Sequence, residues 1–200
     1  MLVVFEGIDG SGKTTQARML YRALRRMKYE VTLMREPTDS ELGRKIKALL
    51  RTRKYTVEEL YSLFLADRKS HADTIRRLLE RGYIVILDRY YISTIAYQGA
   101  QGIPVTRILN DHKDLPKPDI VFLLDIDPEK ALSRLNSRDA FENIEFLRRV
   151  RKMYLEAGKI LSRLGYRIEI IDADRPPREI HQKILRIVLG ILAHGGVKNE

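Results

Sequence analysis

The sequence predicts an α/β fold in which a five-stranded parallel sheet carries helices on both of its faces. The first observation is a set of five short apolar segments rich in β-branched residues: Leu2–Phe5, Val31–Met34, Ile84–Leu87, Ile120–Leu124 and Ile168–Ile171. Each segment is continuous rather than alternating, which is typical of strands covered on both faces. The second observation is that helical patterns lie between the segments, an order that indicates a parallel sheet with right-handed crossovers.

The first predicted strand leads into a glycine-rich loop and then into a helix. Gly7 to Thr14 match the pattern G-x-x-x-x-G-K-[ST] of a phosphate-binding P-loop. Apolar residues recur at helical spacing after the loop, at Ala17, Leu20, Leu24 and Met27. A glycine-rich turn with a chance Lys-Thr pair is the alternative, but strand, loop and helix stand in the order that the motif requires. We therefore predict a P-loop NTPase fold.

Each position of this loop has a physical role in holding a polyphosphate. Glycines let the backbone wrap closely around the anion with its N–H groups pointing inward. Lys13 would reach the β- and γ-phosphates, and the Thr14 hydroxyl would ligate Mg²⁺. A helix that begins just after Gly12 would point the positive end of its dipole at the same anion.

The longer helices are predicted from their apolar spacing. In the helix from about Val57 to Glu80, Phe64 and Arg68 share one face and could sandwich and hydrogen-bond a base. The alternative is that Phe64 belongs to the core and Arg68 caps its edge, and periodicity alone favours it. The helix from about Ile144 to Leu164 should pack on the sheet without a role in chemistry, through Leu147, Val150, Tyr154, Ala157, Leu161 and Leu164. A last helix is predicted to start at Pro176-Pro177.

Polar residues follow every predicted strand. Active sites of parallel sheets lie beyond the carboxyl ends of the strands. The segments at these positions are Asp9, Arg35-Glu36-Pro37, Asp88-Arg89-Tyr90, Asp125-Ile126-Asp127 and Asp172-Ala173-Asp174. We expect the functional site along this edge of the sheet.

Composition limits the class of protein and its location. The chain has 200 residues, no cysteine and a formal net charge of +10. Without cysteine there is no disulfide framework and no thiolate metal site. No apolar run is long enough to span a bilayer, and the sequence enters its first strand directly. We therefore expect no membrane segment, no signal peptide and a cytoplasmic location.

The positive charge admits two classes of partner, nucleic acid or small phosphorylated substrates. The Lys and Arg residues are spread along the chain, and many lie on the polar faces of predicted helices, as Arg22, Arg25 and Arg26 do. Such faces are usually solvated. We therefore favour small phosphorylated substrates and expect no nucleic-acid partner.

The P-loop alone leaves the reaction open, because kinases, GTPases, motors and helicases all use it. The short chain favours small-molecule kinases and GTPases, and the GTPase base-reading motif Asn-Lys-x-Asp is absent from the sequence. None of the four histidines has the context of a catalytic triad. We expect phosphoryl transfer, which depends on Arg, Lys and Mg²⁺ for charge neutralisation rather than on a nucleophile.

Five motifs then follow one another along the chain: Phe5–Gln16, Arg35-Glu36-Pro37, Phe64–Arg68, Asp88-Arg89-Tyr90 with Ser93-Thr94 and Ala96–Gly99, and Leu115–Asp119. Through them the chain resembles the thymidylate kinase family over nearly its full length. The combination of Asp-Arg-Tyr with Ala-Tyr-Gln-Gly is highly specific to that family. The resemblance implies a single domain over residues 1–200, with a short lid at about 133–143.

The resemblance also implies an activity and its partners. Members of the family transfer the γ-phosphoryl group of ATP to dTMP, giving dTDP and ADP with Mg²⁺, as a step of dTTP biosynthesis. The family also suggests a homodimer. The implied ATP-binding residues are Gly7, Ile8, Asp9, Gly10, Ser11, Gly12, Lys13, Thr14 and Thr15. Thr14 and Asp88 are the implied metal residues, Asp88 acting through water.

By the same resemblance, a second set would hold dTMP: Asp9, Arg35, Glu36, Pro37, Lys47, Phe64, Arg68, Arg89, Ser93, Thr94, Tyr97 and Gln98. Phe64 would stack on thymine and Arg68 would bond its carbonyl edge, which reverses the preference from periodicity. Asp9 would contact the 3′-hydroxyl, and Tyr97 would crowd the 2′ position and favour deoxyribose. Arg89 would clamp the acceptor phosphate, oriented by Glu36. Thr94 and Gln98 would face the base.

The chain departs from the family at two positions. Some members carry a basic residue inside the loop where this chain has Gly10, so a catalytic arginine must come from elsewhere. The implied catalytic set is therefore Lys13, Asp9, Arg89, Arg134 and Arg138, the last two in the lid segment. A solvated basic helix end is the alternative for that segment. The second departure is Lys47, which keeps the charge of an arginine but not its bidentate fork.

Two other functions stay open at this point. The first is a kinase for deoxynucleosides or for several nucleoside monophosphates, because one side chain such as Thr94 at the base edge can change selectivity. The second is a basic P-loop protein that binds nucleic acid. The dispersed Lys and Arg residues, without an aromatic-basic patch, argue against the second function.

Overall fold

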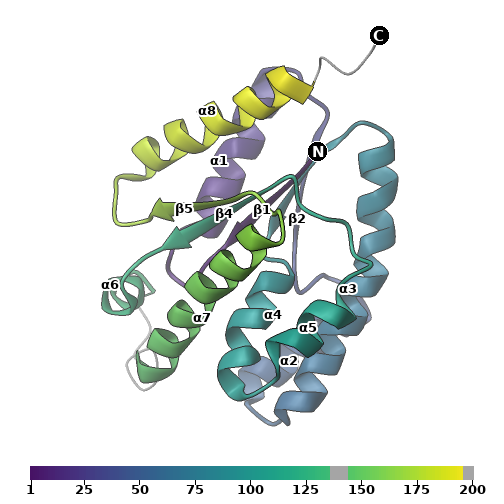
Figure 1. Cartoon of the computed structure of the whole chain (residues 1–200), viewed down its shortest axis with the longest axis vertical. Coiled ribbons are helices and arrows are strands. Elements are labelled where there is room, and N and C mark those ends of the chain that lie inside the picture. Colours follow the sequence, from purple (N-terminus) through teal and green to yellow (C-terminus); the bar gives the residue numbers. More distant parts are fainter. Residues whose placement is uncertain (136–143, 196–200) are drawn as a thin grey trace.

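The computed structural model describes residues 1–135 and 144–195, and the five predicted strands are confirmed (Figure 1). They are β1 (Leu2–Glu6), β2 (Val31–Arg35), β3 (Ile84–Asp88), β4 (Ile120–Asp125) and β5 (Ile168–Asp172). Each strand runs one residue beyond its predicted end, and that extra residue is charged in every case. The backbone pairing continues there, since Arg35 pairs with Asp88 and Asp125 with Asp172. The sheet therefore presents a charged residue at the carboxyl end of every strand.

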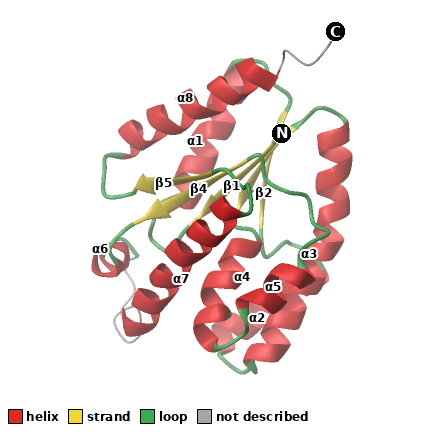
Figure 2. Ribbon diagram, in the orientation of Figure 1, coloured by secondary structure: helices red, strands yellow, loops and turns green. Residues whose placement is uncertain are grey.

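The sheet is parallel throughout, in the order β2-β3-β1-β4-β5. In the central strand β1, Val4 pairs with Leu87 on one side and Val121 on the other. Every residue of β1 and β3 is buried, as their continuous apolar sequences require, whereas the edge strands β2 and β5 are partly exposed. The arrowheads of β4 and β5 in Figure 2 mark the carboxyl ends of the strands, which is where the loops of the candidate site lie.

Helices cover both faces of this sheet, as predicted. Helices α1 (Lys13–Arg26) and α8 (Pro177–Gly195) pack on one face, and α4 (Tyr91–Tyr97) and α7 (Ile144–Arg163) pack together on the other (Figure 1). The long helix α3 (Val57–Glu80) stands on the β2 side of the sheet, with α2 (Glu41–Thr52) against it. The remaining short helices are η1 (Gly99–Gln101), α5 (Val105–Asp111) and α6 (Pro128–Ser133).

The predicted helices agree with the structure except at two ends. Helix α3 has the predicted bounds, and the Thr56 hydroxyl caps it by accepting a hydrogen bond from the amide of Glu59 at 3.1 Å. The prediction of Leu164 as a helical core position is wrong, and Met27, which the spacing predicts as part of the first helix, also lies outside it. Met27 and Leu164 follow the last residues of α1 and α7 and are 46% and 56% exposed, because both helices end before the apolar spacing does.

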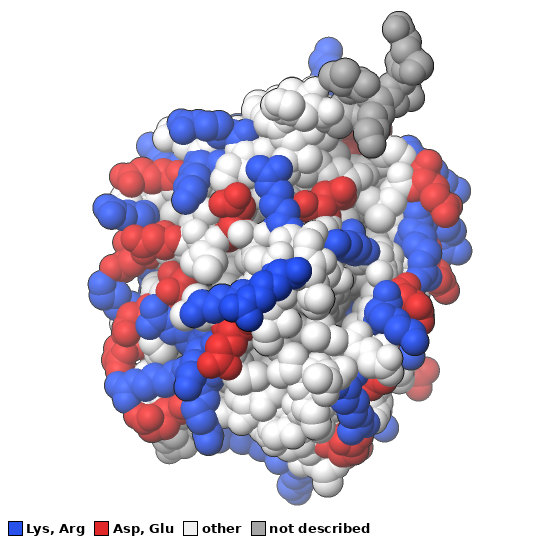
Figure 3. Space-filling view, in the orientation of Figure 1, with Lys and Arg blue, Asp and Glu red and all other residues white. Residues whose placement is uncertain are grey.

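Charges of both signs are interspersed on the face drawn in Figure 3, with Asp and Glu beside many of the Lys and Arg residues. Exposed side chains of opposite charge form ion pairs in the structure, such as Arg107 with Glu58 and Arg148 with Glu129. Among residues 1–135 and 144–195, no helix combines the length and the apolar character needed to cross a membrane.

The P-loop lies against α6 at Gly10. Gly10 has a φ of +81°, a conformation that favours glycine, and a Cβ built on it would stand 2.2 Å from the carbonyl oxygen of Ala131. That oxygen belongs to the helix backbone and cannot move aside as a side chain could. The sequence departure at Gly10 therefore has a steric cause: the approach of α6 leaves no room for any side chain.

We predict that Gly10→Ala lowers the free energy of unfolding by about 2 kcal/mol more than Gly82→Ala does, because overpacking adds to the backbone strain. Gly82 is a matched control, since its φ is +79° and a Cβ there would meet nothing within 4 Å. Urea unfolding of both variants measures the difference. Equal losses would show that α6 does not confine position 10.

Candidate active site

The P-loop wraps around the first turn of α1. Gly12 is the N-cap of this helix, with a φ of 91°, and Lys13 is its first residue. The Lys13 ammonium donates a hydrogen bond to the carbonyl oxygen of Ile8 at 2.7 Å, so it is folded back into its own loop. The hydroxyl of Ser11 is buried and has no hydrogen-bond partner among the described residues. An unpaired donor, a buried ammonium and a helix N-terminus together form a site for an anion.

Electrostatics around the loop favour an added negative charge. Burial, and then the nearby Arg89 guanidinium, lower the pKa of Lys13 to about 7. The same guanidinium lowers the pKa of Asp9 to about 2, so this carboxylate is ionised at neutral pH. A phosphate group bound in the loop would favour the charged form of Lys13, because an opposite charge stabilises an ammonium.

Thr14 and Asp88, the two residues that the resemblance implies for a metal site, lie in contact. The Thr14 hydroxyl donates to Asp88 Oδ2 at 2.5 Å, and Arg35 Nε lies 4.0 Å from the same oxygen. Hydroxyl and carboxylate oxygens are ligands that suit Mg²⁺. Among the described residues there is no cluster of three or more His, Cys, Asp or Glu side chains that could hold a metal. A Mg²⁺ ion here would therefore take its other ligands from water and phosphate.

Arg89 connects the P-loop with α4 and α7. Its φ of +76° turns the side chain across the loop. Nη2 donates to Asp9 Oδ1 at 2.5 Å, while Nη1 donates to the hydroxyls of Ser93 at 3.0 Å and Tyr154 at 3.1 Å. The guanidinium also lies 5.4 Å from the centre of the Tyr97 ring. Asp9, Ser93 and Tyr97, three of the residues predicted to hold dTMP, thus surround Arg89, which belongs to the same predicted set.

The prediction that Glu36 orients Arg89 is wrong. Glu36 is buried, and its Oε2 accepts from Arg68 Nε at 2.5 Å while its Oε1 lies 3.1 Å from His71 Nδ1. Both partners belong to α3, whose position beside the β2–α2 loop brings them to this carboxylate. Arg89 is held instead by Asp9, and Glu36 orients Arg68.

Among the remaining base-site candidates, Thr94 is in contact with Arg68. Thr94 Oγ1 accepts from Arg68 Nη1 at 2.9 Å, and both residues are buried. Gln98 is also buried, one helical turn further along the chain than Thr94. Phe64 is half-buried and lies outside the hydrophobic core cluster. The interpretation of Phe64 as a core residue, which periodicity favoured, therefore does not hold.

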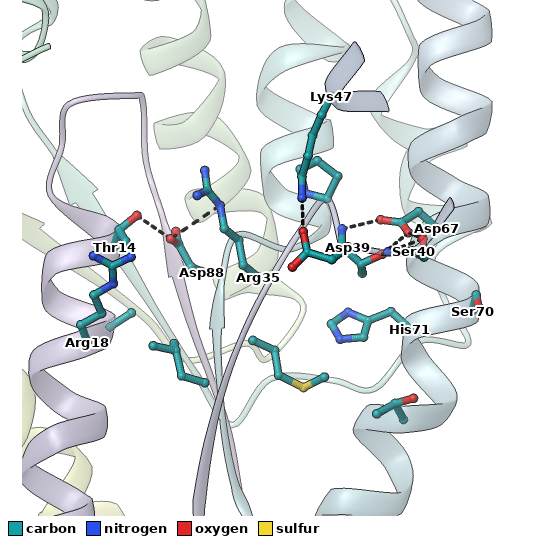
Figure 4. Close-up of a pocket in the computed structure, with 16 residues that line it drawn as sticks. Thr14, Arg18, Arg35, Asp39, Ser40, Lys47, Asp67, Ser70, His71 and Asp88 are labelled. Atoms are coloured by element: carbon teal, nitrogen blue, oxygen red, sulfur yellow. Dashed lines mark hydrogen bonds and ion pairs between the residues drawn. The ribbon is translucent and has the colours of Figure 1, made fainter. Parts of the chain in front are cut away.

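Two cavities meet at the carboxyl ends of β2 and β3. One, of about 530 Å³, is lined by the P-loop together with Arg89 and Arg134. The other, of about 650 Å³, lies between α1, β2 and α3 and is drawn in Figure 4. Thr14, Arg35 and Asp88 line both cavities, so a ligand in one is next to a ligand in the other.

Lys47 reaches the larger cavity from α2, where Arg35 and Pro37 also line it (Figure 4). Its ammonium lies 2.5 Å from Asp39 Oδ1, and both side chains are substantially exposed. Exposed ion pairs are weak, so this contact leaves Lys47 free to bind an anion instead. Most of the residues predicted to hold dTMP therefore lie in three places: some contact Arg89, some contact Arg68, and some line this cavity.

Of the two lid arginines, the structure describes Arg134 but not Arg138. Arg134 is the C-cap of α6; its Nη1 donates to the carbonyl oxygen of Ala173 at 3.0 Å, and it lines the P-loop cavity. Arg138, with the rest of the predicted lid at 136–143, lies outside the described residues. Arg175 lines the same cavity and was not predicted.

Sequence reasoning also missed Glu6 and Tyr154. Helix α7 packs on the sheet as predicted, with Tyr154 in the core, and the buried Tyr154 hydroxyl also reaches Arg89 and lies within 2.8 Å of Ser93 Oγ, contacts that the core spacing did not predict. Glu6 is fully buried at the end of β1, where it accepts hydrogen bonds from the amides of Tyr90 and Ser93. A glutamate directly after an apolar strand was the available signal for it.

Glu6 should make stability depend on pH near neutrality. Burial raises the pKa of Glu6 from 4.5 to about 7. Between pH 4.5 and pH 7 the folded protein therefore keeps a proton on Glu6 that the unfolded chain has already lost. Stability from this group therefore falls as pH rises from 4.5 to 7. We expect wild type to lose about 1–3 kcal/mol relative to Glu6→Gln over this range.

Denaturant unfolding of both proteins at pH 5, 6, 7 and 8 measures this difference. Comparing the two proteins also removes the opposite contribution of His112, whose lowered pKa makes stability rise with pH below 6.5. Parallel curves for wild type and Glu6→Gln would contradict the prediction.

Comparison with known proteins agrees with this geometry. The family model described as thymidylate kinase matches residues 5–184. A protein from Archaeoglobus fulgidus named probable thymidylate kinase is 39% identical over 197 residues, covering 96% of each chain. One of the same name from Pyrobaculum calidifontis is 42% identical, covering 94% of this chain and 95% of its own. A thymidylate kinase from Xylella fastidiosa strain M12 is 38% identical, covering 96% and 88%. This chain belongs to the thymidylate kinase family.

Proposed function

We propose that this chain transfers the γ-phosphoryl group of ATP to dTMP, forming dTDP and ADP in dTTP biosynthesis. The observation that carries the proposal is the position of Arg89. Its guanidinium contacts the P-loop through Gly7 and Asp9 and the acceptor side through Ser93 and Tyr97. A donor phosphate in the loop and an acceptor phosphate beside α4 would meet at this one cation, which is the geometry that phosphoryl transfer needs.

The donor would bind in the P-loop cavity. The loop amides and the Ser11 hydroxyl would bond the phosphate oxygens, and Lys13 would leave the carbonyl of Ile8 to neutralise the β- and γ-phosphates. Thr14 and Asp88 would hold Mg²⁺, which supplies charge neutralisation between the phosphates. Because Asp9 stays ionised beside Arg89, the guanidinium keeps its orientation before substrate arrives.

The acceptor would bind between α3 and α4. Phe64 offers a half-buried ring for stacking on thymine, and Arg68 offers donors to a base carbonyl. Tyr97 lies with its hydroxyl 3.5 Å from Asp9 Oδ2, so both residues would face the sugar. Arg89 would clamp the acceptor phosphate, with Arg35 and Lys47 adding charge from the neighbouring cavity. A homodimer and a cytoplasmic location remain predictions from the sequence.

A panel of nucleoside monophosphates in a coupled ADP-release assay tests the function. We expect kcat/KM for dTMP to exceed the values for AMP, GMP and UMP by at least about 100-fold, because base carbonyls and the sugar are both read. Lys13→Ala is the control for contaminating kinases and should lose most of the turnover. A faster reaction with AMP, GMP, UMP or a free deoxynucleoside would overturn the proposal.

The two lid arginines should differ in the same assay. An arginine that acts on the charge of the transition state lowers kcat when it is removed, by roughly 100-fold or more. We expect this of Arg138→Ala. Arg134 is already bound to the backbone of Ala173, so Arg134→Ala should mainly raise the KM for ATP. The reverse pattern of kcat and KM would assign the catalytic role to Arg134.

A further inference from the structure

Arg68 is a buried guanidinium whose donors are almost all engaged by the protein. It is 2% exposed. Nε donates to Glu36, the two hydrogens of Nη1 go to Thr94 Oγ1 and His112 Nε2, and Nη2 lies 3.4 Å from the carbonyl oxygen of Tyr90. An arginine has five N–H donors. Among the described residues, these contacts leave one N–H of Nη2 for a ligand.

The contact between Arg68 and His112 has only one chemically sound form. A guanidinium can donate but not accept, so His112 Nε2 must accept at 2.9 Å. The other ring nitrogen, Nδ1, lies 2.6 Å from the carbonyl oxygen of Ile108, one turn back in α5, and must donate there. The two neighbours together fix a neutral imidazole with its hydrogen on Nδ1.

The surroundings keep His112 in that neutral form. The residue is 4% exposed, and its ring packs near the rings of Tyr61 and Tyr91. Burial, and then the charge of Arg68, lower the pKa of His112 to about 3, despite Asp111 nearby. An uncharged acceptor suits this position, since Glu36 already balances the charge of Arg68 and a protonated imidazole would repel the guanidinium.

We propose that His112 is a positioning residue for Arg68, which aims the one remaining N–H of the guanidinium at the acceptor base. The inference rests on the proposed function, in which Arg68 bonds the base. It adds that the fixed N–H selects acceptor bases by the chemical group that faces it. A donor held at a fixed point favours a base with a carbonyl there and disfavours one with an amino group, because two facing donors are left unpaired.

Two substitutions separate the two ring nitrogens. In His112→Gln the amide oxygen stands near the position of Nε2 and can still accept from Arg68. In His112→Asn the shorter amide replaces only Nδ1 and leaves Arg68 without this acceptor. We expect His112→Asn to raise the KM for dTMP by about tenfold with kcat changed by less than about threefold. We expect His112→Gln to keep the KM for dTMP within about threefold of wild type.

The matched control is His194→Asn. The Nδ1 of His194 also lies 2.6 Å from the carbonyl oxygen four residues back, at Gly190 in α8, but this residue is exposed. Losing that local bond should leave the KM for dTMP unchanged. Melting temperatures of all variants show whether His112→Asn still folds. An unchanged KM in His112→Asn, or an equal rise in His112→Gln and His112→Asn, would overturn the inference.

A measurement without substrate separates this inference from the proposed function. In ¹⁵N NMR of the ¹⁵N-histidine-labelled wild-type protein, His112 should show a protonated Nδ1 and an unprotonated Nε2 that do not titrate between pH 5 and 8. An Nε2–H tautomer or a titration in this range would overturn the inference whatever the acceptor is. If the tautomer is as expected but dTMP is a poor acceptor, the proposed function fails while the Arg68–His112 contact stands.

Discussion

The ion pair between Arg89 and Asp9 is the interaction on which the site depends. It joins the end of β3 to the P-loop, and the same guanidinium reaches Ser93 on α4 and Tyr154 on α7. Three regions that lie far apart in the sequence, namely the P-loop, the β3–α4 segment and α7, therefore share one cation. Because the side chain of Arg89 is only 12% exposed, removing a partner would leave a largely buried charge short of acceptors, which is costly. Arg89 and its partners thus both stabilise the fold and form part of the candidate active site.

The pKa values of the ionisable groups near Arg89 are shifted, and a bound phosphate would oppose the shift of Lys13. Lys13 loses part of its charge at neutral pH because it is buried beside another cation, while Asp9 is held ionised by that cation. Glu6 lies behind them with a raised pKa and bonds the first turn of α4. The region carries an excess of positive charge on the side of the P-loop. Anionic ligands would relieve that excess, since low dielectric strengthens every interaction of opposite charges.

The strands could be predicted from the sequence because burial on both faces leaves a continuous apolar run. Their last residues could not, since a charged residue such as Glu6 or Asp88 can continue the backbone pairing after the apolar run stops. The P-loop followed from a motif with fixed local geometry, whereas the place of Asp88 beside Thr14, 74 residues away along the chain, was expected only from the family resemblance.

The partners of individual side chains could not be predicted in the same way. Glu36 binds Arg68 rather than Arg89 because of where α3 lies, which no local pattern specifies. Tyr154 sits at a helical core position and resembles an aliphatic residue in its spacing, yet its hydroxyl meets an arginine 65 residues away. His112 was missed for a similar reason, because its only local sign is a position at the end of a short helix.

The close approach of α6 to Gly10 limits the routes by which such a chain can change during evolution. A basic side chain in the loop and the carbonyl of Ala131 compete for the same space, so the two arrangements exclude each other. A single substitution at position 10 would meet the helix backbone before it gained any contact with phosphate. Displacing α6 first would disturb Arg134, which this helix carries at its C-cap. Moving an arginine into the loop therefore requires at least two coordinated changes, with a less stable intermediate between them.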